Sequence, residues 1–356
     1  MNILGLMSGS SLDGLDMALT AFSESSQGVI SFDLLKSKAV EFPKNLHDRL
    51  KHVVRLTSYE LFKLEADFSY FLGQCCIDFI QNSKSNVDLI ASHGHTVFHD
   101  PQNKFTVQIG NGGTISQLVR RDVVCDFRSS DIALGGQGAP FAPIADQFLF
   151  PDIDILVNLG GISNISIKSQ DGIIAFDVSP ANQLLNYLAS RNGKAYDQDG
   201  EWARSGETND KLLDKLMQIN GLESAKPRGM DNTWVQENFI PHLQSIEVRD
   251  GLRTVVEFII HEITKAIALA KHSSKNPLKI MFTGGGALNL FLMEGLAREM
   301  TAINIEIVPA GKELIQYKEA IMIALMGYLR VNRKVNVLNS YTGASRNSIG
   351  GCIYAC

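Results

Sequence analysis

Apolar residues alternate with polar ones, or occur in short β-branched runs, near the start of the chain. This pattern predicts strands at about 2–7, 15–22 and 29–42. The last of them is long enough for a hairpin arm or an edge strand. Helical spacing follows in 43–56 and 59–83, with Pro43 and Ser58 as candidate caps. We therefore expect an antiparallel meander followed by two helices.

Three further segments complete the first 150 residues. Residues 87–100 read as a buried strand that runs into a loop, and 105–119 as a strand, a glycine turn and the start of a helix. Residues 122–150 read as a strand followed by a long loop rich in Gly and Pro.

The pattern then restarts. Residues 152–167 again place an apolar strand before a small-residue turn and another after it, and 172–190 add a strand and a helix. This likeness to the first twenty residues predicts two lobes with the same internal plan, 1–150 and 151–356. Strands mixed with helices on this scale predict an α/β fold.

Composition narrows the class of protein. At 356 residues the chain exceeds what one hydrophobic core usually serves, and a net charge of -5 gives no electrostatic footprint for nucleic acid. No apolar run reaches the roughly 18 residues that span a bilayer, so we expect a cytoplasmic protein without a membrane partner. The cysteines form no CxxC pair, and we interpret all five as buried thiols: Cys75, Cys76, Cys125, Cys352 and Cys356.

Four glycine-rich turns each follow an apolar strand, at 9–14, 135–138, 160–161 and 284–286. Neither a Walker-type phosphate loop nor a dinucleotide-binding G-x-G-x-x-G is present. Glycine backbone can nevertheless lie against phosphate oxygens and bind them through N–H groups without a lysine. One such turn is usually only a turn, but four in one chain favour a nucleotide cleft.

Three aspartates near these turns are candidates for chemistry. Asp13 and Asp16 bracket Gly14, and both could be Asx-turn caps, an interpretation favoured for Asp16. Asp13 is a candidate for Mg²⁺ binding through water. Asp177 lies between a buried strand and a Pro-initiated helix, where it could act as a general base or cap the helix.

Histidine and arginine residues supply further polar candidates. His93 and His95 would share one strand face, but the segment that holds them and His99 lacks a carboxylate or Cys partner that fits a metal site, so substrate hydrogen bonding is favoured over metal ligation. Arg128 and Asp131 are an ion-pair candidate at a strand end. Alternatively, the Arg128 fork could bind a ligand carboxylate.

Motifs in a fixed order run from one end of the chain to the other. They are GLMSGSSLDGLDMAL, SHGHTVFH, VQIGNGGTI, VVCDFRSSDIALGGQGAP, VNLGGISNIS, FDVSPANQLLN, FTGGGALN, KEAIMIALMG and TGASR. This set resembles the anhydro-N-acetylmuramic acid kinases, within the actin, hexokinase and sugar-kinase superfamily. The resemblance implies a two-lobed actin/hexokinase-like ATPase fold with ATP and a sugar in a central cleft.

The resemblance also implies an activity. Water opens the 1,6-anhydro ring of anhydro-N-acetylmuramic acid while O6 takes the γ-phosphate, which gives N-acetylmuramic acid 6-phosphate for peptidoglycan recycling. ATP and Mg²⁺ are the implied cofactors, the partners are ATP and the small anhydrosugar, and a homodimer is compatible with these features.

Site residues carry over from the matching motifs. Asp177 would activate water, and Arg128 would bind the lactyl carboxylate of the sugar. The residues expected around the sugar are His93, Arg128, Asp131, Asn182 and Glu319. Those expected around ATP are Gly9, Ser10, Ser11, Leu12, Asp13, Gly14, Leu15, Asp16, Gly160, Gly161, Gly284, Gly285, Gly286 and Asn289.

The chain departs from the family pattern at several positions. It has DVSPAN where the family has DTGPGN, Asn111 in place of Asp, His95 in place of Gln, and no Thr in the first turn. Asp177 is retained despite these changes. Because they alter residues expected near the sugar, they leave more than one sugar substrate open. The alternatives are a kinase for another anhydrosugar such as levoglucosan, an actin-like regulatory ATPase, and an ATP-independent sugar-binding protein or glycosidase.

Overall fold

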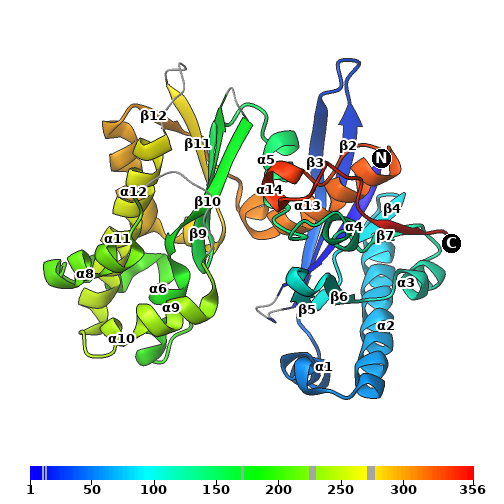
Figure 1. The fold of residues 1–356 in the computed structure, drawn as a ribbon, viewed down its shortest axis with the longest axis horizontal. Coiled ribbons are helices and arrows are strands. Elements are labelled where there is room, and N and C mark those ends of the chain that lie inside the picture. Colours follow the sequence, from blue (N-terminus) through cyan, green and yellow to red (C-terminus); the bar gives the residue numbers. More distant parts are fainter. Residues whose placement is uncertain (10–11, 13, 170–171, 224–229, 271–276) are drawn as a thin grey trace. The chain divides into compact units, whose positions relative to one another are not determined.

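The computed structural model describes residues 1–9, 12, 14–169, 172–223, 230–270 and 277–356. The chain forms two compact units, and Figure 1 shows the elements of each. The first unit combines Met1–Phe150 with Tyr317–Cys356, and the second is Pro151–Gln316.

The assignment of all of 151–356 to the second lobe is therefore wrong for the last forty or so residues. The reason lies in helix α13 (Lys312–Val331), whose residues from Tyr317 to Leu329 are buried except for the exposed Glu319. A Cβ added to Gly5 in the first unit would lie 1.9 Å from the Ala320 carbonyl oxygen, so this helix packs directly on that sheet. The apolar pattern predicts burial of the helix but does not say against which sheet.

The first unit is built round a six-stranded sheet in its described residues, in the order β13-β7-β4-β1-β2-β3. The strands are β1 (Asn2–Ser8), β2 (Leu15–Glu24), β3 (Ile30–Val40), β4 (Leu89–Ser92), β7 (Val123–Cys125) and β13 (Cys352–Tyr354). The first three are antiparallel neighbours, which confirms the meander and the edge position of the third strand. β4 is parallel to β1, and β7 is parallel to β4.

A separate hairpin pairs β5 (His95–Asp100) with β6 (Phe105–Ile109). The sequence predicts a loop where β5 lies, and this prediction is wrong because the segment finds its hydrogen-bonding partner in the following strand. His95 is part of this strand, whereas His93 precedes it, so the two histidines do not share a strand face.

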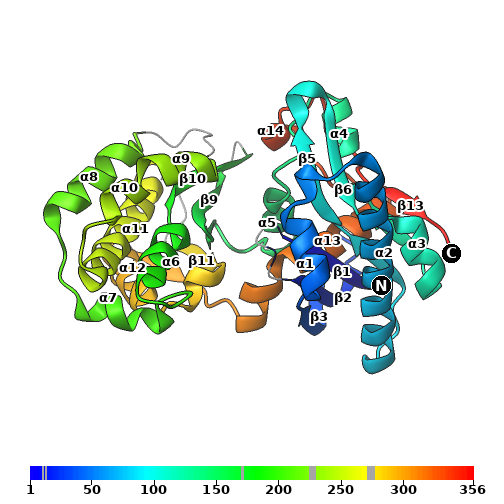
Figure 2. The ribbon, with the colours of Figure 1, turned by 90° about the horizontal axis from the view of Figure 1, so that it is seen from below.

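Helices complete the first unit. They are α1 (Lys44–Lys51), η1 (Val53–Arg55), α2 (Ser58–Asn82), η2 (Pro101–Asn103), α3 (Gly112–Val119), α4 (Ser129–Ala133), α5 (Ala142–Leu149) and α14 (Asn339–Thr342), besides α13. The cap of α2 is Thr57, which forms a capping box with Glu60. α2 packs beside α3, as Figure 2 shows. The predicted long loop before residue 150 contains two short helices, α4 and α5.

The second unit has a five-stranded sheet in its described residues, in the order β10-β9-β8-β11-β12, which matches β3-β2-β1-β4-β7 of the first unit without its additional strand β13. These strands are β8 (Ile155–Leu159), β9 (Ile162–Ser169), β10 (Gly172–Pro180), β11 (Leu278–Thr283) and β12 (Ile305–Ile307). Three antiparallel strands again lie beside two parallel ones. The prediction of two α/β lobes with the same internal plan is confirmed.

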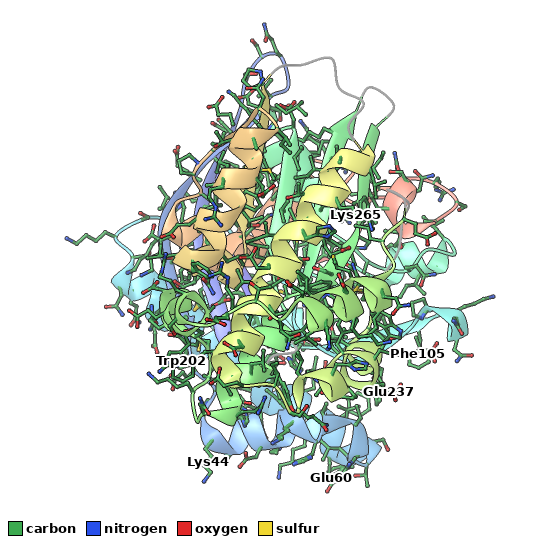
Figure 3. The ribbon with its side chains drawn as sticks, turned by 90° about the vertical axis from the view of Figure 1, so that its left-hand side faces the viewer. Lys44, Glu60, Phe105, Trp202, Glu237 and Lys265 are labelled. Atoms are coloured by element: carbon green, nitrogen blue, oxygen red, sulfur yellow. The ribbon has the colours of Figure 1, made fainter. Side chains whose placement is uncertain are left out.

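Helices complete the second unit. They are α6 (Asn182–Arg191), η3 (Gln198–Gly200), α7 (Glu201–Ser205), α8 (Asp210–Asn220), α9 (Asn232–Asn238), α10 (Ile240–Leu243), α11 (Val248–Ala270), η4 (Gly285–Leu288) and α12 (Leu290–Ala302). In Figure 3, α11, with Lys265 labelled, lies across the strands. Its predicted apolar face is buried, with Val255, Ile259 and Ile263 inaccessible to solvent.

The cysteines are all free, and three of them are buried. Cys352 and Cys356 are exposed, so the prediction of buried thiols is wrong for these two. Both lie in or after the edge strand β13, where one side of the backbone has no neighbouring strand to cover it. No helix within the described ranges has both the length and the hydrophobicity to cross a membrane.

Candidate functional site

The first turn joins β1 to β2, and its described residues include Gly9, Leu12 and Gly14. The Leu12 N–H donates to the Gly9 carbonyl at 3.3 Å, and Leu12 and Gly14 both have positive φ. A Cβ on Gly14 would lie 2.5 Å from the Val40 carbonyl oxygen. The close approach of β3 is therefore sufficient reason for a glycine at this position. Ser10, Ser11 and Asp13 lie outside the described residues.

The two residues that end this turn belong to β2. Leu15 is buried in the core, so its side chain packs inward and only its backbone is available to a ligand. Asp16 lies in the strand ladder opposite Met7 and Ala39. Its role as a cap or as an ATP contact stays a prediction.

Two more predicted turns lie at one edge of the second sheet. β8 and β11 are parallel neighbours with Asn158 opposite Thr283, so the glycines that follow them emerge together at the carboxyl ends of the strands. Gly284 has φ 80°, and a Cβ on it would lie 2.6 Å from the Asn158 side-chain oxygen. Gly161 and Gly285 are exposed at this edge. The backbone of Gly161 and Gly285 is therefore accessible at the strand ends, whereas Gly284 is closely packed.

Two asparagines stabilise these turns. The Asn182 amide donates to the Leu159 carbonyl at 2.9 Å, and its backbone N–H donates to the Gly160 carbonyl at 3.1 Å. The Asn289 side chain accepts from the Leu292 N–H at 3.0 Å and caps α12. Asn182 and Asn289 thus both contact the glycine turns, and the role of Asn182 toward the sugar stays a prediction.

Asp177 lies near the end of β10 and is half-buried. α6 begins later, at Asn182, with Ala181 in the cap position, so the alternative that Asp177 caps this helix is wrong. One Asp177 carboxylate oxygen accepts from the Met230 backbone N–H at 2.7 Å. Sequence reasoning missed Met230, because nothing in its local pattern indicates a contact with a strand 53 residues earlier.

His93 and Arg128 contact each other in the first unit. The Arg128 Nε and Nη2 atoms lie 3.2 and 2.9 Å from His93 Nε2, and His93 Nδ1 lies 3.1 Å from the Gly94 carbonyl oxygen. Nδ1 therefore donates and Nε2 accepts, which requires a neutral ring. Burial, together with the Arg128 charge, lowers the pKa of His93 to about 3.

The Arg128 guanidinium is fixed on two further sides. Its Nη1 donates to the Gly138 carbonyl at 2.6 Å, and the group lies 4.8 Å from the centre of the Phe141 ring. Burial lowers the pKa of Arg128 to about 10, against the opposing effect of the Glu319 carboxylate, so the guanidinium stays charged at neutral pH. Its hydrogen bonds use three of five N–H groups and leave one on each terminal nitrogen, a geometry that suits a carboxylate.

Asp131 does not pair with Arg128, so the predicted ion pair is wrong. Its fully buried carboxylate accepts from the Gly138 N–H and from the Thr342 hydroxyl, each at 2.7 Å. Arg128 and Asp131 thus hold the same glycine, one through its carbonyl and the other through its N–H. Asp131 stabilises the loop and is not available to a ligand.

The other two histidines have separate partners. Nδ1 of His95 lies 2.9 Å from the Ser8 hydroxyl, and Nδ1 of His99 lies 3.1 Å from the Thr106 hydroxyl. Burial lowers the pKa of both rings. Within the part of the chain that the structure describes, no three His, Cys, Asp or Glu residues are grouped to hold a metal ion.

A cavity of about 230 Å³ lies in the first unit beside His93. Its polar lining includes His93, Glu65, Gln108, Asn111, Asp126 and Ser129. Sequence reasoning missed this cavity, since its lining comes from α2, β6, the start of α3 and the segment after β7. The sequence signal that could have indicated the cavity is Asn111, a polar residue within the glycine motif VQIGNGGTI.

Two α/β units that share the order of five strands, with glycine turns at strand ends, agree with the actin/hexokinase-like fold that the sequence motifs imply. The family model described as anhydro-N-acetylmuramic acid kinase matches residues 1–356, and the chain belongs to that family.

Curated relatives agree over nearly the whole length. The anhydro-N-acetylmuramic acid kinase of Pelagibacter ubique is 30% identical, covering 98% of this chain and 97% of that protein. The Synechococcus elongatus protein of the same name is 31% identical, with 100% of both covered. Ligand-bound xylulose kinase from Lactobacillus acidophilus matches with a TM-score of 0.45 at 10% identity, covering 99% of this chain and 93% of that one. A TM-score this low bears on neither activity nor substrate.

Proposed function

We propose that this protein is an ATP-dependent kinase that hydrolytically opens the 1,6-anhydro ring of anhydro-N-acetylmuramic acid and phosphorylates O6. The family match over residues 1–356 supports the reaction class and the sugar. One observation carries the chemistry: a half-buried carboxylate, Asp177, is oriented by a backbone N–H at the end of a rigid strand. Such a carboxylate suits general-base catalysis.

The proposed reaction couples opening of the anhydro ring to phosphoryl transfer. Asp177 accepts a proton from water as the water oxygen attacks the anomeric carbon, and the bond from that carbon to O6 breaks. O6 then takes the γ-phosphoryl group of ATP, and ADP leaves. The ring opening supplies the nucleophile for phosphoryl transfer, so one base serves both events.

Sugar recognition is assigned to the first unit. Arg128 suits the lactyl carboxylate because its charge is retained, its plane is fixed by His93 and Gly138, and both terminal nitrogens keep an N–H. Glu319 lies close enough to Arg128 to affect its pKa, which supports a position beside the same group.

ATP is assigned to the glycine turns. Accessible Gly161 and Gly285 support binding of phosphate or adenosine at the carboxyl ends of β8 and β11. Mg²⁺ belongs to the proposal through the ATP phosphates, where it would neutralise charge on the transferred group. Asp13, outside the described residues, would contact it through water. A cytoplasmic location follows from the use of ATP, and the homodimer stays a prediction.

The test is to incubate the protein with MgATP and either anhydro-N-acetylmuramic acid, levoglucosan or no sugar, and to follow ADP and sugar 6-phosphate. We expect ADP formation that depends on the first sugar. Equal ADP formation without sugar would favour a regulatory ATPase and contradict the proposal. Turnover of levoglucosan alone would contradict the assigned substrate.

Asp177→Asn then tests the base. We expect ADP affinity to be retained and kcat to fall by about 10²-fold or more, the scale of general-base loss. Asp214→Asn, an exposed aspartate on α8, is the matched control and should keep wild-type kcat. A near-wild-type kcat for Asp177→Asn would remove the assignment.

A further inference from the structure

We infer that Asn220, held in place by the buried Glu262, is a positioning residue for the general base Asp177. The inference rests on the proposed function for its catalytic consequence. Neither residue belongs to a recognised motif of the chain, and both lie on helices behind the strand that carries Asp177.

The register of β10 against β9 changes where Asp177 lies. Asp177 pairs with Asn164 and Ser179 pairs with Ser163, which leaves Val178 as an extra residue in a β-bulge. A bulge bends its strand and redirects the neighbouring side chains. The Val178 side chain is fully buried in the core, whereas Asp177 is half-buried on the other face.

The Val178 carbonyl accepts a hydrogen bond from outside the sheet. The Asn220 Nδ2 group donates to it at 3.0 Å, and the same nitrogen donates to a Glu262 carboxylate oxygen at 2.6 Å. Nδ2 carries two hydrogens, so both are used. If the amide were flipped, its oxygen would face the Val178 carbonyl oxygen and the Glu262 carboxylate oxygen, and neither can donate a hydrogen bond. The two acceptors therefore fix the orientation of the Asn220 amide.

Burial makes this arrangement rigid. Asn220 is 4% exposed and Glu262 is fully buried. Glu262 also lies 3.2 Å from the exposed His261 ring through its other oxygen. An unmet donor or acceptor at this depth is costly, so the three groups stay together.

A serine pair holds the bulge from the β9 side. The Ser179 N–H donates to the Ser163 hydroxyl at 3.2 Å, and that hydroxyl lies 3.0 Å from both the carbonyl and the hydroxyl oxygen of Ser179. Both serines are fully buried. The residue after Asp177 is thus fixed by α8 and α11, and the residue after that by β9.

Displacement of Asp177 would lower the rate of catalysis, because a general base works only in a narrow range of positions. A general base must stay within a few tenths of an ångström of its working position, and a displacement of about 1 Å can lower turnover by about 10²-fold. Asn220 contacts neither ATP nor sugar in the proposed site. Loss of Asn220 should therefore lower kcat and leave the two KM values unchanged.

The test compares three variants in the full-length protein with saturating MgATP and anhydro-N-acetylmuramic acid. Asn220→Asp removes the hydrogen bond to the Val178 carbonyl at constant size, because a proton on the new carboxyl group would be shared with the Glu262 carboxylate, and we expect kcat to fall by roughly 10- to 100-fold with each KM within about twofold of wild type. Glu262→Leu should behave similarly. Glu262→Gln keeps an acceptor for Asn220 and should retain most of kcat. Wild-type kcat in Asn220→Asp would overturn the inference.

Asn336→Asp is the control for loss of a buried asparagine. Its amide donates to the Met326 and Gly350 carbonyls at 3.1 and 3.0 Å, all in the first unit. We expect a lower melting temperature with kcat retained. If Asn336→Asp loses as much kcat as Asn220→Asp, the effect is general destabilisation and the inference falls.

A crystal structure of Asn220→Asp gives a readout that does not depend on the proposed reaction. We expect the Asp177 carboxylate to move by about 1 Å or more from its contact with the Met230 N–H. An unmoved carboxylate would overturn the inference even if the substrate were different. Absence of sugar-dependent ADP formation by wild type would instead contradict the proposed function.

Discussion

Acidification should destabilise this protein through His93. The ring accepts from Arg128 at Nε2, and protonation would remove the acceptor and place a second cation beside the guanidinium. Burial and that neighbouring charge therefore hold the pKa of His93 at about 3 in the folded protein. In the unfolded chain the same ring titrates near 6.5, the usual value.

The sign and size of the effect follow from these two values. Between about pH 3 and 6.5 the unfolded chain binds a proton that the folded protein does not, so the free energy of unfolding falls as pH falls through this window. From pH 7 to pH 5 the loss due to His93 is about 2 kcal/mol. Above pH 7 the ring is neutral in both states and contributes no pH dependence.

Urea unfolding followed by circular dichroism at pH 7, 6 and 5 measures this loss. His93→Gln lacks the titrating ring, so its free energy of unfolding should fall by about 2 kcal/mol less than that of wild type over the range. His52→Gln, an exposed histidine in the same unit, should follow wild type. Equal pH dependence in wild type and His93→Gln would refute the reasoning.

Two further predictions concern packing and exposure. Gly284→Ala should lower the free energy of unfolding by about 3 kcal/mol or more, because the new Cβ would lie 2.6 Å from the Asn158 side-chain oxygen and the residue has a positive φ. Gly193→Ala also has a positive φ, 75°, but has open space around it, so it should lower the free energy of unfolding by only about 1–2 kcal/mol. Fluorescence of Trp202 and Trp234, both in the second unit, follows this unfolding, and equal losses would contradict the packing argument. A thiol reagent should modify the exposed Cys352 and Cys356 rapidly and the buried Cys75, Cys76 and Cys125 slowly in folded protein, since burial raises the pKa of these three thiols. Rapid reaction of all five would contradict the described burial.

The sequence predicts those parts of the fold that depend on residues only a few positions apart. The meander from Asn2 to Val40, the restart after Phe150 and the apolar face of α11 all follow from periodicity over a few residues. The turn glycines were recognisable because a strand that ends in glycine marks a change of backbone direction.

Contacts between distant segments could not be predicted in this way. Arg128 and Asp131 suggested an ion pair because they are close in sequence, yet Asp131 binds Thr342, 211 residues away. Asn220 and Glu262 carry no local signal, because a polar residue in a helix is usually solvated. The sequence pattern places residues 317–356 in the wrong unit for the same reason, since hydrophobicity predicts burial without specifying the partner.

The return of the chain to its first unit has a consequence for synthesis on the ribosome. The second unit is continuous from Pro151 to Gln316 and can complete its sheet as it emerges. The first unit is synthesised earlier but finishes later, because the helix that packs on Gly5 ends only at Val331 and its edge strand begins at Cys352. Until then an apolar face of its sheet is uncovered, so the nascent N-terminal half is the part of the chain that needs protection from aggregation.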